Sequence, residues 1–217
     1  MFGKLLDPEG PLNRIADMII GSFLVGLFTV LCSIPLITAG TAFTAGYYAM
    51  AKSVRHHEGY VWREYFRSFA RNIRQGIGLG IGYVIAALVI VFDFVYLKER
   101  TDSFGDAMFM ILVVVTLIWF MTFFFVFFEL SRFDRRGFDI LKFGVITAFR
   151  HFVSSIGIVL IFAVSFLLVY LMPWGFALFP GFAFYGATFL MERVMRKYMP
   201  AFEEGSEEAE KWYNKKL

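Results

Sequence analysis

The chain has 217 residues, which is enough for one domain or two small ones. Hydrophobic residues make up 59% of it and charged residues 18%, whereas soluble domains have about 45–50% and about 25%. A soluble domain this small cannot bury so much apolar surface, because its surface is large relative to its volume. The composition therefore argues against a soluble enzyme, a disordered chain or a nucleic-acid-binding protein, and it predicts an integral membrane protein.

Five apolar stretches are long enough to cross a bilayer, since about 20 helical residues span a hydrocarbon core of about 30 Å. The last stretch is short and holds Pro180, so a kink or a half-inserted hairpin is an alternative there. Only Pro173 and Trp174 separate it from the fourth stretch, which predicts a tight turn. We predict an all-α polytopic membrane protein with one transmembrane domain over residues 1–199 and a polar cytoplasmic tail over residues 200–217. The five predicted spans are residues 15–37, 76–97, 107–130, 152–172 and 175–191.

Basic residues are distributed unevenly over the connecting segments. Six Lys or Arg lie between the first two spans, five between the third and fourth, and six after the fifth, whereas the other segments together hold four. Five crossings put these groups on opposite sides of the membrane, 17 against 4. Because positive residues stay cytoplasmic, we expect the N-terminus outside and the C-terminus in the cytoplasm. The first apolar run is too long for the core of a cleaved signal peptide, and no positive cluster precedes it, so we expect it to be retained.

The first cytoplasmic loop has the pattern of an amphipathic helix. Aromatic residues recur at helical spacing on one side, and arginines recur on another. Such a helix lies in the membrane interface, packs on the protein's own bundle or docks on a partner, and the sequence leaves these alternatives open. Residues 138–152 repeat the theme more weakly, which predicts two interfacial helices, each leading into a span. The first helix is defined by Trp62, Phe66 and Phe69 on its aromatic side and by Arg63, Arg67 and Arg71 on its cationic side.

The first predicted span ends near a proline. Pro35 breaks or kinks the helix, because it lacks a backbone donor and clashes with the preceding turn. The residues at 38–44 are mostly small and allow helices to approach closely. We expect a break here, followed by a short helix that carries Tyr47 and Tyr48.

Alternating glycines open the second predicted span. Gly76 and Gly80 form one GxxxG pair, and Gly78 and Gly82 form another. Both pairs predict close packing of this helix against its neighbours.

Motifs for catalysis and metal binding are not evident in the sequence. It contains no HExxH, no GxSxG and no paired CxxC, and its single cysteine, Cys32, excludes an internal disulfide. His56, His57 and Glu58 form a lone cluster without further ligands nearby, whereas a metal needs three or four converging ligands. We therefore expect no enzymatic activity, no metal and no cofactor.

Acidic residues near membrane depth are the remaining polar candidates, because a carboxylate at the bilayer centre costs about 2.5–3.5 kcal/mol on insertion scales. Each of them lies within about two turns of a span end, where this cost falls. Helical spacing predicts that Glu129 pairs with Arg132 and that Glu192 pairs with Arg196. The set serves either as interface anchors or as part of a proton or cation pathway. Its members are Asp17, Asp93, Glu129 and Glu192.

Two short patterns carry a resemblance to a known family. One is a Pro-x-x-Thr-x-Gly segment that leads through small residues to a tyrosine, and the other is a Phe-x-x-Phe-x-x-Asn pattern. They consist of Pro35, Thr38, Gly40 and Tyr48, and of Phe66, Phe69 and Asn72. With these features the chain resembles the YesL-like family of bacterial membrane proteins, which is filed under a domain of unknown function. The family pattern often shows proline after the glycine. This chain instead has Ala42 two positions after the glycine, which is a minor departure.

The resemblance implies a bacterial plasma membrane and, because family members are often found beside sugar-importer components and carbohydrate-degrading enzymes, an accessory role in carbohydrate uptake. We expect a non-enzymatic component associated with a carbohydrate (oligosaccharide) ABC-type importer, in contact with the lipid bilayer and with permease or ATPase subunits but not with nucleic acid. The alternative is a stand-alone small-solute transporter or channel. Its intramembrane polar candidates are Asp17, Asp93 and Glu129. The candidates for partner contact are Pro35, Thr38, Gly40, Tyr48, Trp62, Arg63, Phe66, Arg67, Phe69, Arg71 and Asn72.

Overall fold

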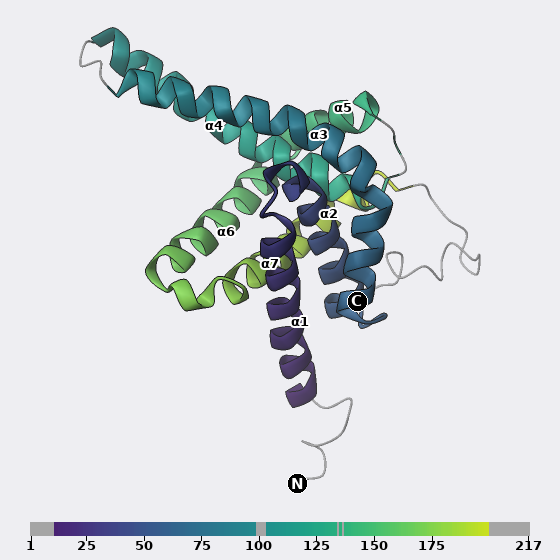
Figure 1. Ribbon diagram of the computed structural model, residues 1–217. Helices are drawn as coiled ribbons and strands as arrows, with labels where there is room; N and C mark the ends of the chain where they lie inside the picture. The colour runs from purple at the N-terminus through teal and green to yellow at the C-terminus, as the bar shows by residue number, and fades with distance from the viewer. Residues whose placement is uncertain (1–10, 99–102, 134, 136, 200–217) are drawn as a thin grey trace.

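The computed structural model describes residues 11–98, 103–133, 135 and 137–199, so the predicted tail lies outside the described residues. All regular structure in these ranges is helical, which confirms the all-α class (Figure 1). The α-helices are α1 (Pro11–Cys32), α2 (Ala39–Ala49), α3 (Val61–Leu97), α4 (Ser103–Leu130), α5 (Phe138–Arg150), α6 (Phe152–Leu171) and α7 (Leu178–Met195). Shorter elements are the 3₁₀ turns η2 (Leu36–Thr38) and η4 (Pro173–Gly175) and the π-helical segment η3 (Met50–Arg55).

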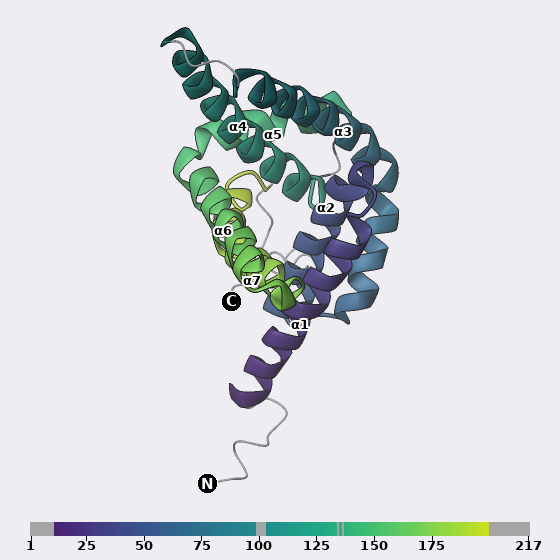
Figure 2. The same cartoon turned by 60° about the vertical axis from the view of Figure 1, so that its left-hand side comes forward.

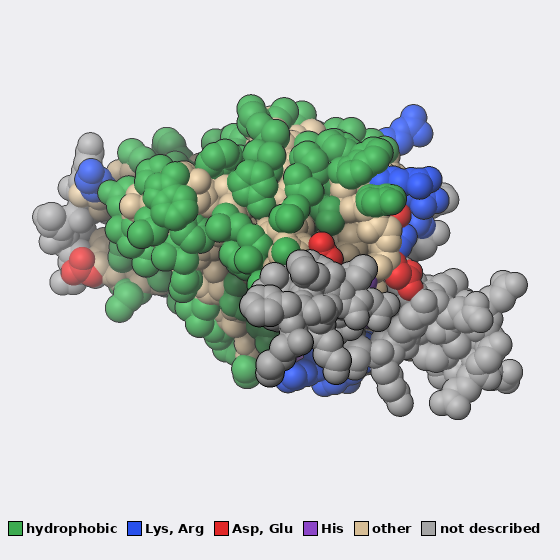
Figure 3. Space-filling view, turned by 90° about the horizontal axis from the view of Figure 1, so that it is seen from below, with side chains coloured by type: hydrophobic (Ala, Val, Ile, Leu, Met, Phe, Trp, Pro, Cys, Tyr) green, Lys and Arg blue, Asp and Glu red, His purple; other side chains and the backbone are tan. Residues whose placement is uncertain are grey.

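Helices suited to a lipid environment make up most of the structure. Four of the described helices are long and apolar enough to cross a membrane, and they contain Ile15–Cys32, Val61–Leu97, Phe104–Leu130 and Phe152–Leu171. Figure 3 shows a broad apolar face, with Lys and Arg gathered toward the right of the view and a small charged group at the far left. Apolar surface on this scale, exposed between charged ends, indicates a membrane protein.

The fifth predicted crossing falls on α7, which is not among these four helices. It follows α6 through the short turn η4, as the Pro-Trp dipeptide predicted. The two helices pack side by side in Figures 1 and 2, and their far ends meet: His151 Nε2 lies 3.2 Å from the Tyr198 hydroxyl. The chain therefore returns after α7 to the end of the hairpin where α6 begins. This pairing supports a fifth crossing, which stays a prediction.

The predicted interfacial helix and the second predicted span form one continuous helix, α3. Its 37 residues make it about 55 Å long at 1.5 Å per residue, well beyond a hydrocarbon core of about 30 Å. No proline interrupts it between Arg74 and Gly76, so the helix runs on. Figures 1 and 2 show that it changes direction part-way. Its first part lies beside α2, and its second part forms an arm with α4. By contrast, α5 is separate from α6, because the chain breaks at His151.

The small residues after Pro35 form the centre of the molecule. The break after α1 is as predicted, and the Thr38 hydroxyl donates to the carbonyls of Cys32 and Pro35, both at 2.7 Å. In α2, eight of the eleven residues are buried, because small side chains let neighbouring helices approach. Phe43 is one of three large side chains in α2, with Tyr47 and Tyr48. Its ring lies 5.3–5.9 Å from the rings of Phe123, Phe124, Phe162 and Phe184 on α4, α6 and α7.

Glycines set the closest contacts between helices. A Cβ on Gly26 of α1 would lie 1.7 Å from the carbonyl oxygen of Ala177, and one on Gly181 of α7 would lie 1.9 Å from that of Ser22. The predicted pair at 76 and 80 also packs closely, against Thr41 and the Ile37 carbonyl. The predicted pair at 78 and 82 does not, because a Cβ at either position would meet nothing within 4 Å. One glycine face of α3 is thus used for packing, and the other is open.

Candidate functional site

A π-helical segment brings charged side chains into the interior. Met50–Arg55 continues α2 as η3, and π-helical turns are rare and often mark functional sites. Lys52 Nζ on this segment lies 2.9 Å from Glu64 Oε2 of α3. His56, which follows the segment, has its Nε2 3.5 Å from Glu192 Oε2 of α7. The connection between α2 and α3 therefore contacts one carboxylate on α3 and another on α7.

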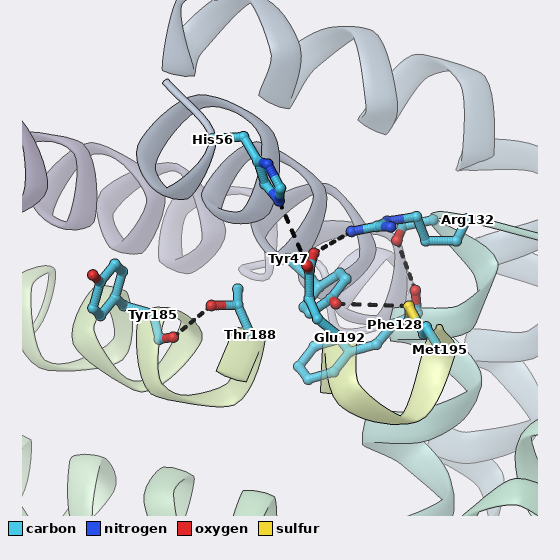
Figure 4. Close-up of polar contacts among 9 residues, drawn as sticks. Tyr47, His56, Phe128, Arg132, Tyr185, Thr188, Glu192 and Met195 are labelled. Carbon is cyan, nitrogen blue, oxygen red and sulfur yellow. Dashed lines mark hydrogen bonds and ion pairs between the residues drawn. The ribbon is translucent and has the colours of Figure 1, made fainter. Parts of the chain in front are cut away.

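Glu192 is the centre of the more deeply buried of these groups (Figure 4). Arg132 Nη2, just after the end of α4, donates a hydrogen bond to Glu192 Oε1, and His56 approaches the other carboxylate oxygen. The side chains of all three residues are only 3% exposed. The guanidinium of Arg55 lies nearby, 4.2 Å from the centroid of the Phe189 ring. We call His56, Arg132 and Glu192 the buried charge cluster.

The surroundings of Glu192 and of Lys52 favour the charged form of each side chain. Burial alone raises the pKa of Glu192, but its interaction with His56 and the charges of Arg132 and Arg55 outweigh it, so the pKa is lowered from its ordinary value. Burial alone lowers the pKa of Lys52, but its interactions with Glu64 and Tyr48 together outweigh this, so the pKa is raised. In both pairs a partner of opposite charge compensates for desolvation.

Apolar and polar neighbours hold the buried charge cluster in place. The Tyr47 ring stacks on Phe128 with centroids 4.6 Å apart, and its hydroxyl donates to Met195 Sδ at 3.6 Å (Figure 4). Burial raises the pKa of Tyr47, so this hydroxyl stays protonated. One turn before Arg132, Glu129 is buried and accepts a hydrogen bond of 2.6 Å from the Thr147 hydroxyl of α5. The cluster thus joins η3, α4 and α7, and Glu129 ties α5 to the same end.

The sequence did not reveal this arrangement. The predicted helical pair of Glu192 with Arg196 is wrong, because Arg196 is exposed and Glu192 pairs instead with Arg132 and His56 from other elements. These partners lie 60 and 136 residues away in the sequence, so no local motif predicts the contacts. The one signal in the sequence was the position of Glu192 in an apolar helix, because a buried carboxylate needs a charged partner. Among the described residues, no group of three or more His, Cys, Asp or Glu could hold a metal.

The predicted partner-contact residues on α3 fall into two sets. Phe69 and Asn72 are half-buried, beside residues that were not among the candidates and that are buried against the bundle, namely Glu64, Tyr65 and Ser68. The remaining five residues are exposed and form a continuous aromatic and cationic surface, which we call the α3 face. It consists of Trp62, Arg63, Phe66, Arg67 and Arg71.

The earlier candidates around α2 differ in their exposure. Pro35 is exposed, Thr38 is half-buried, and Gly40 is buried against the ring of Phe127. Tyr48 is half-buried, with the Lys52 ammonium 5.7 Å from its ring centroid. The segment therefore packs α2 within the chain, while its first three residues, Pro35, Leu36 and Ile37, are exposed.

The two outer carboxylates are not brought together. Asp17 is exposed in the first third of α1, and Asp93 is half-buried in a mostly apolar hollow of about 370 Å³ between α3 and α4. The beginning of α1 and the end of α3 lie at opposite ends of the molecule in Figures 1 and 2. The structure thus gives these two residues no shared path.

The first part of the chain is similar to one known protein family. Residues 18–94 match the family described as "Protein of unknown function, DUF624". This stretch is similar to a family of unknown function. It includes most of α1, all of α2 and η3, and nearly all of α3, so it contains Lys52, His56, Glu64 and the α3 face. No curated protein and no solved structure matches the chain.

Proposed function

We propose that the protein is a non-enzymatic accessory component of a membrane assembly and that it binds its partner through the α3 face. The observation that carries this proposal is the division of α3 into a buried side and an exposed side over its first three turns. Trp62 is 57% exposed and Phe66 is 46% exposed, and arginines flank both. Exposed aromatic and arginine side chains are the types that contribute most at protein interfaces.

The α3 face is also held rigidly, which favours binding because little freedom is lost when a partner docks. The Glu64 carboxylate is fixed by Lys52, and the Tyr65 hydroxyl donates to the Ala42 carbonyl at 3.4 Å. The ring of Phe66 lies 5.2 Å from that of Phe28 on α1. The buried side of the helix therefore anchors the exposed side to α1 and α2.

The partner class follows from the YesL-like resemblance. It supports assignment to a bacterial plasma membrane and to a carbohydrate (oligosaccharide) ABC-type importer, whose permease and ATPase subunits would be the partners. The distribution of basic residues, 17 on one side of the membrane and 4 on the other, supports an N-terminus outside and a cytoplasmic C-terminus. In that orientation the α3 face lies on the cytoplasmic side, where an ATPase subunit or the cytoplasmic loops of a permease would be in reach.

The test is a mild-detergent pull-down of the tagged full-length protein from its native membrane, with mass spectrometry of the proteins that follow it. We expect stoichiometric recovery of importer permease and ATPase subunits. The triple variant Arg63→Gln, Arg67→Gln and Arg71→Gln should lower this recovery at least tenfold and leave membrane insertion unchanged.

A second triple variant is the matched control, because it removes the same number of exposed positive charges from the end of α7. It carries Arg193→Gln, Arg196→Gln and Lys197→Gln, and it should retain full recovery. Recovery of the chain alone would overturn the accessory role. Solute flux through liposomes that hold only this protein would then favour the transporter alternative.

A further inference from the structure

The open glycine face of α3 forms one wall of an apolar groove. The groove has a volume of about 540 Å³, within the range of ligand sites. α3, α4 and the start of α5 form its walls. The residues that shape it are Gln75, Gly78 and Gly82 of α3, Trp119 of α4, and Phe138 and Leu141 of α5.

The glycines keep this groove open. A Cβ at position 78 or 82 would meet nothing within 4 Å, so neither glycine serves packing within the chain. The opposite wall is fixed, because Trp119 Nε1 donates to the Tyr83 carbonyl at 3.2 Å and the two rings meet edge to face. The indole face can therefore contact an occupant without losing its own hydrogen bond.

One end of the groove is polar, and among the described residues beside it in the sequence, exposed basic residues outnumber the single exposed carboxylate, Asp139. Gln75 lies there, and its Nε2 donates to the Arg135 carbonyl at 2.7 Å. Arg74 is exposed and stands one turn before Gly78, on the same side of α3. Lys142 is exposed and adjoins Leu141 in α5. The groove thus leads from a basic mouth into an apolar channel between helices.

The length of the groove fits one leaflet of a bilayer. From Gln75 to Ala86, α3 rises about 16 Å, and half of a hydrocarbon core is about 15 Å. The basic mouth lies at the end of the span where the charged loops gather. Basic pockets between transmembrane helices suit the headgroups of anionic lipids.

We propose that this groove binds one anionic phospholipid from the leaflet on the side of the charged loops. One acyl chain lies along Gly78 and Gly82 against Trp119, and the phosphate lies beside Arg74 and Lys142. The site is separate from the α3 face, whose test does not alter Arg74, Lys142 or the glycines.

The experiment uses the fluorescence of Trp119 in the full-length protein with Trp62, Trp174 and Trp212 replaced by Phe. The protein is reconstituted into phosphatidylcholine vesicles that contain either phosphatidylglycerol or phosphatidylcholine with brominated acyl chains. Bromine quenches an indole in contact with it. We expect brominated phosphatidylglycerol to reach half-maximal quenching at a mole fraction about tenfold lower than brominated phosphatidylcholine.

Two variants separate the chain site from the headgroup site. Gly78→Leu with Gly82→Leu fills the groove and should abolish most quenching by both lipids, whereas Ala163→Leu, on an exposed apolar face of α6, should leave it unchanged. Arg74→Gln with Lys142→Gln adds no volume and should remove the tenfold preference while quenching by phosphatidylcholine remains. Equal quenching by both lipids in the unaltered groove overturns the proposal, as does quenching that the leucines do not change, because either result means contact with bulk lipid only.

Discussion

Arg132, just after the end of α4, and Glu192, near the end of α7, share a hydrogen bond, although 60 residues separate them in the sequence. Both side chains are almost completely buried, and His56 approaches the second carboxylate oxygen at 3.5 Å. One carboxylate therefore compensates charges from two other elements. Because the three elements reach this point from different directions, the contact fixes how the ends of α4 and α7 sit against η3.

The variant Glu192→Gln is expected to destabilise the protein strongly. It removes the carboxylate that pairs with Arg132 and lies near Arg55, and breaking a buried ion pair by removing one partner costs about 3–5 kcal/mol. Thermal unfolding in detergent, followed by circular dichroism, measures the effect. The exposed residue Arg196 supplies the control, since Arg196→Gln should change the free energy of unfolding by no more than about 0.5 kcal/mol.

A double variant tests whether the loss comes from unpaired charge. Combining Glu192→Gln with Arg132→Met removes both members of the hydrogen-bonded pair, so it should regain part of the stability lost in the single variant. A double variant less stable than the sum of the two single changes would contradict this explanation.

The buried charge cluster also predicts how stability depends on pH. The pKa of Glu192 is lowered in the folded protein, so its contribution is fully present above the ordinary carboxyl pKa of 4.5. Folding stability should therefore fall as the pH drops below that value and through the lower folded pKa, because the unfolded chain then binds the proton more readily. The measurement is the difference in melting temperature between the unaltered protein and Glu192→Gln from pH 3 to pH 7. This difference should shrink toward pH 3, and a constant difference would count against the assignment.

Much of the fold could be predicted because its signals are local. Length and hydropathy locate the apolar helices, since each backbone group in lipid must be satisfied within its own helix. Pro35 marks the break after α1 for an equally local reason. The continuity of α3 was harder to predict, because the change from charged to apolar sequence near Gln75 resembles a boundary although nothing there stops a helix.

The buried charge cluster depends on tertiary packing and for that reason escaped prediction. His56, Arg132 and Glu192 come from three separate segments. In the sequence Arg132 and Glu192 look like ordinary charges at span ends, and His56 looks like part of a loop. Similarly, GxxxG spacing at Gly76/Gly80 and at Gly78/Gly82 is identical in sequence. Only the positions of α2 and α4 decide which pair packs and which pair lines a groove.

The glycine contacts between α1 and α7 predict a sharp difference between glycine variants. Gly26→Ala and Gly181→Ala each push a Cβ into a backbone carbonyl of the other element, so each should cost about 1–3 kcal/mol or more as the helices separate. Gly78→Ala is the matched control, because its Cβ would enter open space and alanine is about 1 kcal/mol better than glycine inside a helix. Thermal unfolding should show a loss of stability for Gly26→Ala and for Gly181→Ala, and no loss of stability for Gly78→Ala.

The location of both ends of α7 decides whether this helix crosses the membrane. In a Cys32→Ser background, single cysteines at Trp174 and Arg196 stand on exposed residues before and after the helix. Five crossings predict that a membrane-impermeant maleimide labels Trp174→Cys in intact cells but labels Arg196→Cys only after permeabilisation. Lys98→Cys, at the end of α3, should behave like Trp174→Cys because both turns lie on the side with few basic residues. If Trp174→Cys and Arg196→Cys are labelled from the same side, α7 does not cross, and the excess of basic residues no longer falls on one side of the membrane.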